Sequence, residues 1–73
     1  MLTNTEKEVL KQIVCGKTNS EISKNLYMSV STVKTHVSSI LYKLNAKNRV
    51  LAAVKGYILL NEQEKEKKQE IKK

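Results

Sequence analysis

The sequence predicts an all-α domain, and three observations support that prediction. Apolar residues recur at spacings of three and four along most of the chain, which is the period of a helix with one buried face. Thr3 and Thr18 are each followed three residues later by Glu, a pattern that begins helices. No segment alternates apolar and polar residues as a strand does, and 73 residues suffice for one core only.

The first two predicted helices begin after Thr3 and Thr18, where Glu6 and Glu21 complete capping boxes. Gly16 ends the first, because glycine adopts the left-handed cap conformation without a steric penalty. Their apolar faces consist of Val9, Leu10, Ile13 and Val14 in the first helix, and of Ile22 and Leu26 in the second.

Ser29 is the predicted cap of a third helix, and Asn45 is a plausible left-handed residue at its end. Its buried stripe is Val30, Val33, Val37, Ile40, Leu41 and Leu44. A fourth helix begins near Asn48, includes Gly56 at a modest propensity cost, and is more apolar around its circumference than a lone surface helix. We therefore expect a folded domain over residues 1–60 and a charged tail over 61–73, either a frayed helix or disordered.

The formal net charge of +7 is unevenly placed. Residues 61–73 hold five lysines and four glutamates, so +1 belongs to the tail and +6 to residues 1–60. No Asp or Glu lies between Ile22 and Asn61, a stretch that carries Lys24, Lys34, Lys43, Lys47, Arg49 and Lys55. A long acid-free, lysine-bearing stretch is typical of proteins that bind a polyanion.

Several classes of protein do not fit the composition. The lone Cys15 excludes an internal disulfide and a cysteine-based zinc site, and its place at the end of an apolar stripe predicts a small buried hydrophobe. No apolar run could span a membrane, so we expect a cytoplasmic protein. His36 has neither a second ligand nor a nucleophile beside it, so it is expected to pack or to touch phosphate, and no enzyme, cofactor or small-molecule ligand is predicted.

The second and third helices, joined by a short turn, fit a helix-turn-helix. In that motif the second helix lays its exposed residues in the major groove while its other side packs on the core. The third helix has such an opposite face, made of Ser31, Lys34, Thr35 and Ser38.

Much of the chain also resembles a known family. The matching runs are residues 2–10 (LTNTEKEVL), residues 17–26 (KTNSEISKNL), residues 29–44, and Asn48-Arg49 followed by Ala52. In order and spacing they resemble the LuxR/GerE-type helix-turn-helix family of transcription regulators, over about residues 2–60. Departures are Ser38 where a longer side chain is frequent, Asn45 where glycine is common, Ser23 where alanine is common, and Leu51 where a polar residue is usual.

The resemblance implies a four-helix domain that binds double-stranded DNA as a homodimer through its fourth helix. It assigns base contacts to Lys34, Thr35 and Ser38, and contacts near the phosphate backbone to Ser31, Thr32, Lys47 and Arg49; His36 joins the backbone set from the flank of the helix. The excess apolar surface of the fourth helix predicts a dimer interface of Leu51, Val54, Lys55, Ile58 and Leu59. RNA polymerase is a further candidate partner.

Some alternatives stay open from the sequence. Arg49 fits either a phosphate contact or an ion pair with an acid of another helix that merely holds the fold. A promoter-binding module like region 4 of sigma factors shares the helix-turn-helix but does not need an apolar fourth helix. A helical protein-interaction domain without DNA binding is the other class, disfavoured by the acid-free stretch.

Overall fold

Four helices make up the fold, in a computed structural model that describes the backbone of residues 1–72 and the side chains of residues 1–62. They are α1 (Asn4–Val14), α2 (Asn19–Asn25), α3 (Val30–Lys43) and α4 (Arg49–Lys72). Residues 1–72 contain no strand. The predicted all-α, four-helix architecture is therefore confirmed. The predicted tail begins within α4, which continues through residues 61–72, while the side chains beyond residue 62 lie outside the described residues.

Side chains cap the N-terminal ends of the helices as the sequence predicts. The Thr3 hydroxyl accepts from the Glu6 amide at 3.1 Å, and the Glu6 carboxylate accepts from the Thr3 amide at 2.8 Å. Thr18 and Glu21 repeat the arrangement with the same two distances. The remaining caps are Ser29, which accepts from the Thr32 amide at 3.0 Å, and Asn48, which accepts from the Leu51 amide at 2.9 Å. Each bond satisfies an amide that the helix itself leaves without a partner.

The first three helices end in the same way, with one residue at positive φ. These residues are Gly16 at φ 81°, Tyr27 at φ 56° and Asn45 at φ 53°. The next amide then donates to a carbonyl five residues back: Lys17 to Gln12, Met28 to Ser23 and Ala46 to Leu41, at 2.9–3.0 Å. This is the Schellman arrangement. Gly16 and Asn45 were expected from the sequence, whereas Tyr27 was not.

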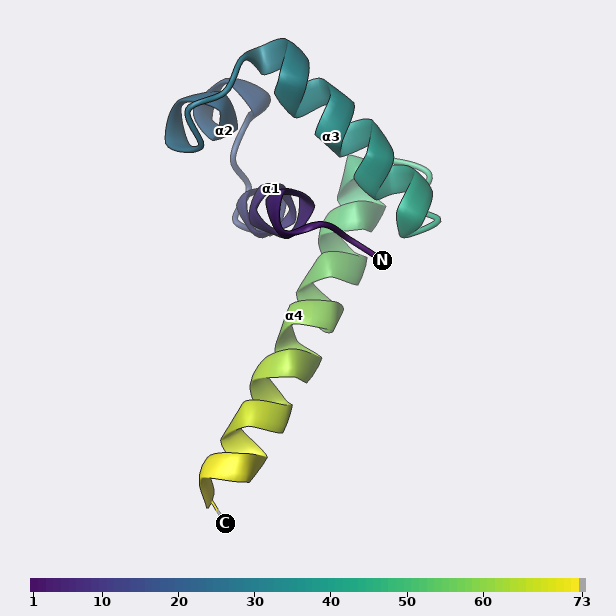
Figure 1. Cartoon of the computed structure of the whole chain (residues 1–73). Coiled ribbons are helices and arrows are strands. Elements are labelled where there is room, and N and C mark those ends of the chain that lie inside the picture. The colour runs from purple at the N-terminus through teal and green to yellow at the C-terminus, as the bar shows by residue number, and fades with distance from the viewer. Residues whose placement is uncertain (73) are drawn as a thin grey trace.

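One apolar core lies where α1, α2 and α3 meet, and α4 packs against α1 and α3 (Figure 1). The core consists of Val9, Leu10, Ile13, Ile22, Val33, Val37 and Ile40. Two predictions about burial were wrong. Val30, at the first turn of α3, is 38% exposed because the core reaches α3 only from Val33 onward. Cys15 is exposed because it follows the last residue of α1, where the chain turns away from the core.

Gly56 allows α4 to approach α1 closely. A Cβ atom at this position would lie 2.6 Å from Leu10 Cδ1, 2.9 Å from Leu10 Cγ and 3.1 Å from Val14 Cγ2. Because Leu10 is fully buried, it has little room to move aside. The glycine is therefore required by packing between the helices.

Candidate DNA-binding surface

The helix-turn-helix is formed by α2 and α3, which pack against each other across a short turn (Figure 1). Val33, Val37 and Ile40 hold one side of α3 in the core. The opposite side presents the four predicted residues together, since Ser31, Lys34, Thr35 and Ser38 are all exposed. This face is open to solvent, as insertion into a groove requires.

Two hydroxyl groups on this part of α3 already have partners inside the helix. The Thr35 hydroxyl donates to the Ser31 carbonyl at 3.2 Å, so its hydrogen is occupied while its methyl group and lone pairs remain free. Thr32 accepts from the Ser29 hydroxyl at 2.9 Å, which places it in the N-terminal cap of the helix. Thr35 is therefore suited to apolar contact, for example with a thymine methyl group.

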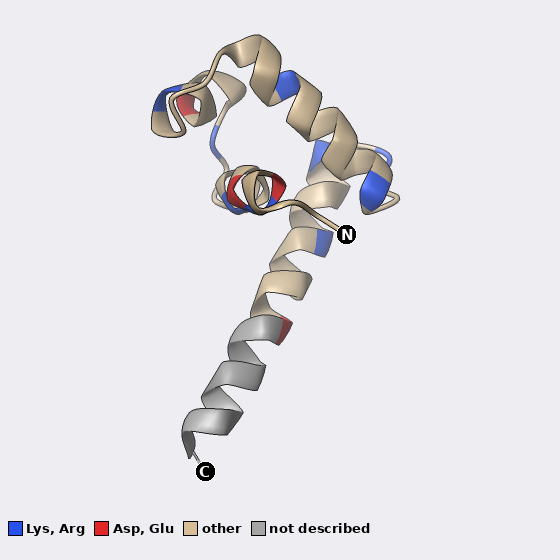
Figure 2. Ribbon diagram, viewed as in Figure 1, with Lys and Arg blue, Asp and Glu red and all other residues tan. Residues whose placement is uncertain are grey.

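The charges leave α3 without an acidic neighbour on its exposed face. In Figure 2 the ribbon of α3 carries blue segments and no red one. The acid nearest to it in the fold, Glu6, is buried and receives hydrogen bonds from Lys43 Nζ at 2.8 Å and from the Ser39 hydroxyl. These bonds, with the Thr3 amide, lower the pKa of Glu6 from 4.5 to about 2. Its charge is therefore neutralised internally by Lys43.

The predicted phosphate-contacting residues outside this face occupy different settings. Lys47 is exposed in the turn between α3 and α4, and His36 is half-buried on the flank of α3. Arg49 forms two hydrogen bonds within the chain through its guanidinium. Nη1 donates to Asn19 Oδ1 at 2.6 Å, and Nη2 donates to the Lys17 carbonyl at 2.7 Å. Of the two alternatives for Arg49, these bonds fit the one in which it holds the fold, although its partners are an amide and a backbone oxygen at the start of α2 and not an acid.

A strip of apolar side chains is exposed along α4. Val50 is 74% exposed, Val54 50%, Tyr57 59% and Ile58 53%, and their spacing places them on one side of the helix. We call these four residues the α4 strip. The sequence singled out Val54 and Ile58 but missed Val50 and Tyr57.

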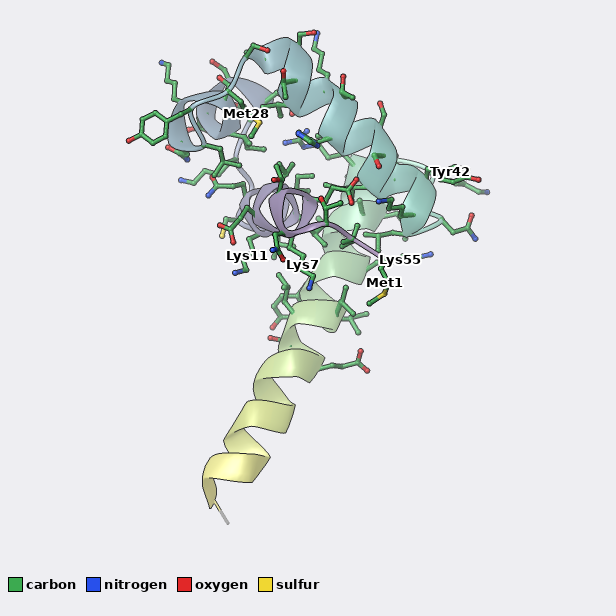
Figure 3. The ribbon with its side chains drawn as sticks, in the orientation of Figure 1. Met1, Lys7, Lys11, Met28, Tyr42 and Lys55 are labelled. Atoms are coloured by element: carbon green, nitrogen blue, oxygen red, sulfur yellow. The ribbon has the colours of Figure 1, made fainter. Side chains whose placement is uncertain are left out.

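The other predicted interface residues of α4 are partly engaged within the chain. Leu51 is half-buried. Lys55 Nζ donates to the carbonyls of Leu44 and Asn45, at 3.0 and 3.1 Å. Figure 3 shows this α4 side chain beside the C-terminal end of α3. Leu59 faces a hollow of about 230 Å³ lined by Met1, Leu2, Lys7, Lys43 and Leu44. None of the predicted DNA-contacting residues lines that hollow.

Two other kinds of feature are absent from the described residues. No helix there is long and apolar enough to cross a membrane. The side chains of residues 1–62 also contain no group of three or more His, Cys, Asp or Glu placed to hold a metal ion.

Comparison with known proteins places this surface in context. The profile of the family described as bacterial regulatory proteins, luxR family, matches residues 1–55. The transcriptional regulatory protein LiaR of Bacillus subtilis is 49% identical over 53 residues, which is 73% of this chain and 25% of LiaR. The response regulator protein VraR of Staphylococcus aureus is 42% identical over 57 residues, 78% of this chain and 27% of VraR.

The CsgBAC operon transcriptional regulatory protein of Escherichia coli is similar over the same part, with 42% identity over 52 residues. These cover 71% of this chain and 24% of that protein. The chain thus spans about a quarter of the length of the relatives it matches. Because the family profile covers most of the chain, this chain belongs to the LuxR family of bacterial regulatory proteins, a family of DNA-binding transcription regulators.

Proposed function

We propose that this chain binds specific sequences of double-stranded DNA as a homodimer and thereby regulates transcription in the bacterial cytoplasm. One copy of α3 enters each of two major grooves, so that the site consists of two-fold related half-sites. Lys34, Thr35 and Ser38 contact base edges, while Ser31, Thr32, His36 and Lys47 lie near the phosphate backbone. RNA polymerase is the partner through which a DNA-bound regulator of this kind would act.

The observation that supports the proposal most strongly is the two-sided character of α3. Its buried side is fixed in the core by Val33 and Ile40, both fully buried, while the exposed side offers Lys34 among short polar side chains. An exposed face of that size and charge can lie in the major groove without repelling phosphate. Arg49 is assigned to the fold instead, because its guanidinium already bonds Asn19 and Lys17.

The α4 strip supports the homodimer. Four large apolar side chains exposed on one side of a helix are costly in water unless a partner covers them. A second copy of the same strip is a self-complementary partner, as two-fold symmetry requires. Leu51 extends the strip on one side. Lys55 contributes less, since its ammonium is hydrogen-bonded within the chain, and Leu59 contributes less because it is half-buried.

The test measures binding to labelled duplex DNA by fluorescence anisotropy across a salt series. Lys34→Ala is expected to weaken binding. It should also reduce the slope of log affinity against log salt concentration by about one, because one fewer lysine displaces a counterion from the DNA. A matched control is Lys11→Ala, which removes the same charge from the side of α1 away from α3 (Figure 3).

Either of two outcomes would contradict the proposal. Folded wild-type protein that does not bind duplex DNA at low salt would exclude DNA as the partner and favour a protein-interaction domain. Equal losses from Lys34→Ala and Lys11→Ala would mean that the charge of the whole domain, and not the exposed face of α3, governs binding.

A further inference from the structure

Tyr42 is an exposed aromatic residue at the far end of α3. Its side chain is 87% exposed, and among the described side chains its hydroxyl has no hydrogen-bond partner. Figure 3 shows it projecting from the last turn of α3, away from α1. Nothing in the packing of the domain accounts for a tyrosine at this position, because neither the ring nor the hydroxyl stabilises the fold.

The helical period places Tyr42 on the face already assigned to DNA. Ser31, Thr35, Ser38 and Tyr42 follow one another at intervals of four, three and four residues, which keeps all four on one side of a helix. This side is opposite Ile40 and the rest of the core. The DNA-facing side of α3 therefore continues beyond Ser38 for one more turn and ends in an aromatic side chain.

The length of α3 indicates what Tyr42 would meet. Tyr42 comes eleven positions after Ser31, which corresponds to about 16 Å along the helix. The major groove is about 12 Å wide. When the first turns of α3 lie against base edges, its last turn is therefore at or beyond the wall of the groove, where phosphate oxygens are the available partners. A long side chain is needed there, and tyrosine provides one.

The chemistry of the neighbourhood favours a phosphate acceptor. A phenol hydroxyl donates one hydrogen bond, and a phosphate oxygen is a charged acceptor that strengthens it. No acidic residue lies on α3 or in the turn that follows, so nothing there repels phosphate. Lys43, the adjacent residue, cannot replace Tyr42 in this role because its ammonium is committed to Glu6 and to the Met1 carbonyl.

We propose that the Tyr42 hydroxyl donates a hydrogen bond to a backbone phosphate and so fixes the angle of α3 in the groove. Tyr42 is then a positioning residue that the base-contacting residues depend on. The inference rests on the proposed function, since it requires that α3 binds DNA. It adds a contact that carries no charge, in contrast to the lysine contacts.

The experiment compares Tyr42→Phe with wild type in the duplex-DNA anisotropy assay across a salt series. Loss of one hydrogen bond to a charged acceptor is expected to weaken binding about tenfold. The salt slope should stay unchanged, because an uncharged donor displaces no counterion. Tyr27→Phe is the matched control: it removes the same hydroxyl from a tyrosine that is 96% exposed in the turn after α2, keeps the ring, and should leave binding unchanged.

Replacement of single phosphates by uncharged methylphosphonates then locates the contact. At the contacted position, wild type should weaken to the level of Tyr42→Phe, and the variant should lose nothing further. Tyr42→Phe that binds as tightly as wild type would overturn the proposal. If Tyr42→Ala alone weakens binding, the ring packs on DNA or on a protein and the hydroxyl contact is wrong.

Failure of this inference is distinguishable from failure of the proposed function. If wild type does not bind duplex DNA at all, the function itself is wrong and Tyr42 has no phosphate to meet. If wild type binds with a normal response to Lys34→Ala while Tyr42→Phe has no effect, only the positioning role is wrong.

Discussion

Glu6 links the start of α1 to the end of α3 through one carboxylate. It accepts from the Thr3 amide in the capping box, and from Ser39 and Lys43 across the core. All three donors favour the ionised form, which is why the pKa of this buried acid is lowered although burial alone would raise it. One residue therefore holds both the first turn of α1 and the last turns of α3.

Protonation of Glu6 should weaken the fold in acid. Because its pKa falls from 4.5 to about 2 on folding, the unfolded state binds more protons between these values. Its contribution is then fully present above pH 4.5 and is lost as pH falls toward 2. Glu6→Gln should be less stable than wild type at neutral pH and should show a smaller decline in stability across this range.

Urea unfolding followed by circular dichroism at several pH values measures this. Glu8→Gln is the control, because Glu8 is exposed and pairs with the exposed Lys11 at 3.4 Å. A decline between pH 4.5 and 2 that is equally steep in Glu6→Gln and wild type would mean that other acids cause it.

For single residues, the sequence predicts hydrogen bonds between near neighbours in the chain and misses those between residues far apart in the chain. The bond between Thr3 and Glu6 spans three residues, so a short pattern reveals it. The bond between Glu6 and Lys43 joins residues far apart in the sequence, and no pattern within one helix indicates it. Tyr27 at positive φ was missed because tyrosine gains nothing locally from that conformation; the Schellman bonds from Met28 to Ser23 impose it.

Among the elements, α1 and α4 depend on the absence of a side chain at Gly56. In an exposed helix, Gly→Ala would stabilise by roughly 0.8–1 kcal/mol. Here the added methyl group would overlap Leu10 and Val14, and overpacking of a core costs about 1–3 kcal/mol. The second effect is larger, so the fit between the helices decides the outcome.

We therefore expect Gly56→Ala to lower the stability of the domain by about 1 kcal/mol, the difference between the overpacking cost and the propensity gain. Thermal unfolding should show a fall in Tm of about 4–8 °C for a domain of this size. Leu10→Val removes the atom nearest to the added methyl group, so the same substitution in that background should cost much less. Equal losses in both backgrounds would show that the overlap with Leu10 is not the cause.

The elements themselves were largely predictable, because caps and apolar spacing are properties of short segments. The starts of α1, α2 and α3 follow from Thr3, Thr18 and Ser29. Burial at the ends of these helices was less predictable. Val30 and Cys15 fit the apolar spacing of α3 and α1, but no part of the core covers them. Such errors arise because periodicity indicates which side of a helix is apolar but not how far along the helix another element covers it.

For the whole molecule, the α4 strip is the surface on which the proposed dimer depends. Val54→Glu with Ile58→Glu should give a folded monomer with weakened DNA binding, because the substituted side chains are exposed in the monomer but would bury charge in the interface. Sedimentation velocity with and without duplex DNA measures the oligomeric state, and circular dichroism checks the fold.

Added negative charge could by itself repel DNA, so Val54→Lys with Ile58→Lys is the control. The lysine pair should break the dimer as the glutamate pair does while adding attraction to DNA. A dimer that persists in both variants would exclude the α4 strip as the interface. Two of its members, Val50 and Tyr57, were missed by the sequence analysis because which side of α4 is covered depends on where α1 and α3 lie.

The two hydrogen bonds from Lys55 to the end of α3 have a consequence for how such a regulator can diversify. They join α4 to the carbonyls of Leu44 and Asn45, so the helix of the proposed dimer is held at a fixed place relative to α3, the helix proposed to meet the bases. The separation of the two reading helices is then a property of buried and bonded groups. The preferred bases are a property of exposed ones. In the proposed complex, substitutions at Lys34, Thr35 or Ser38 would therefore change which operator is recognised, while its spacing would be inherited unchanged.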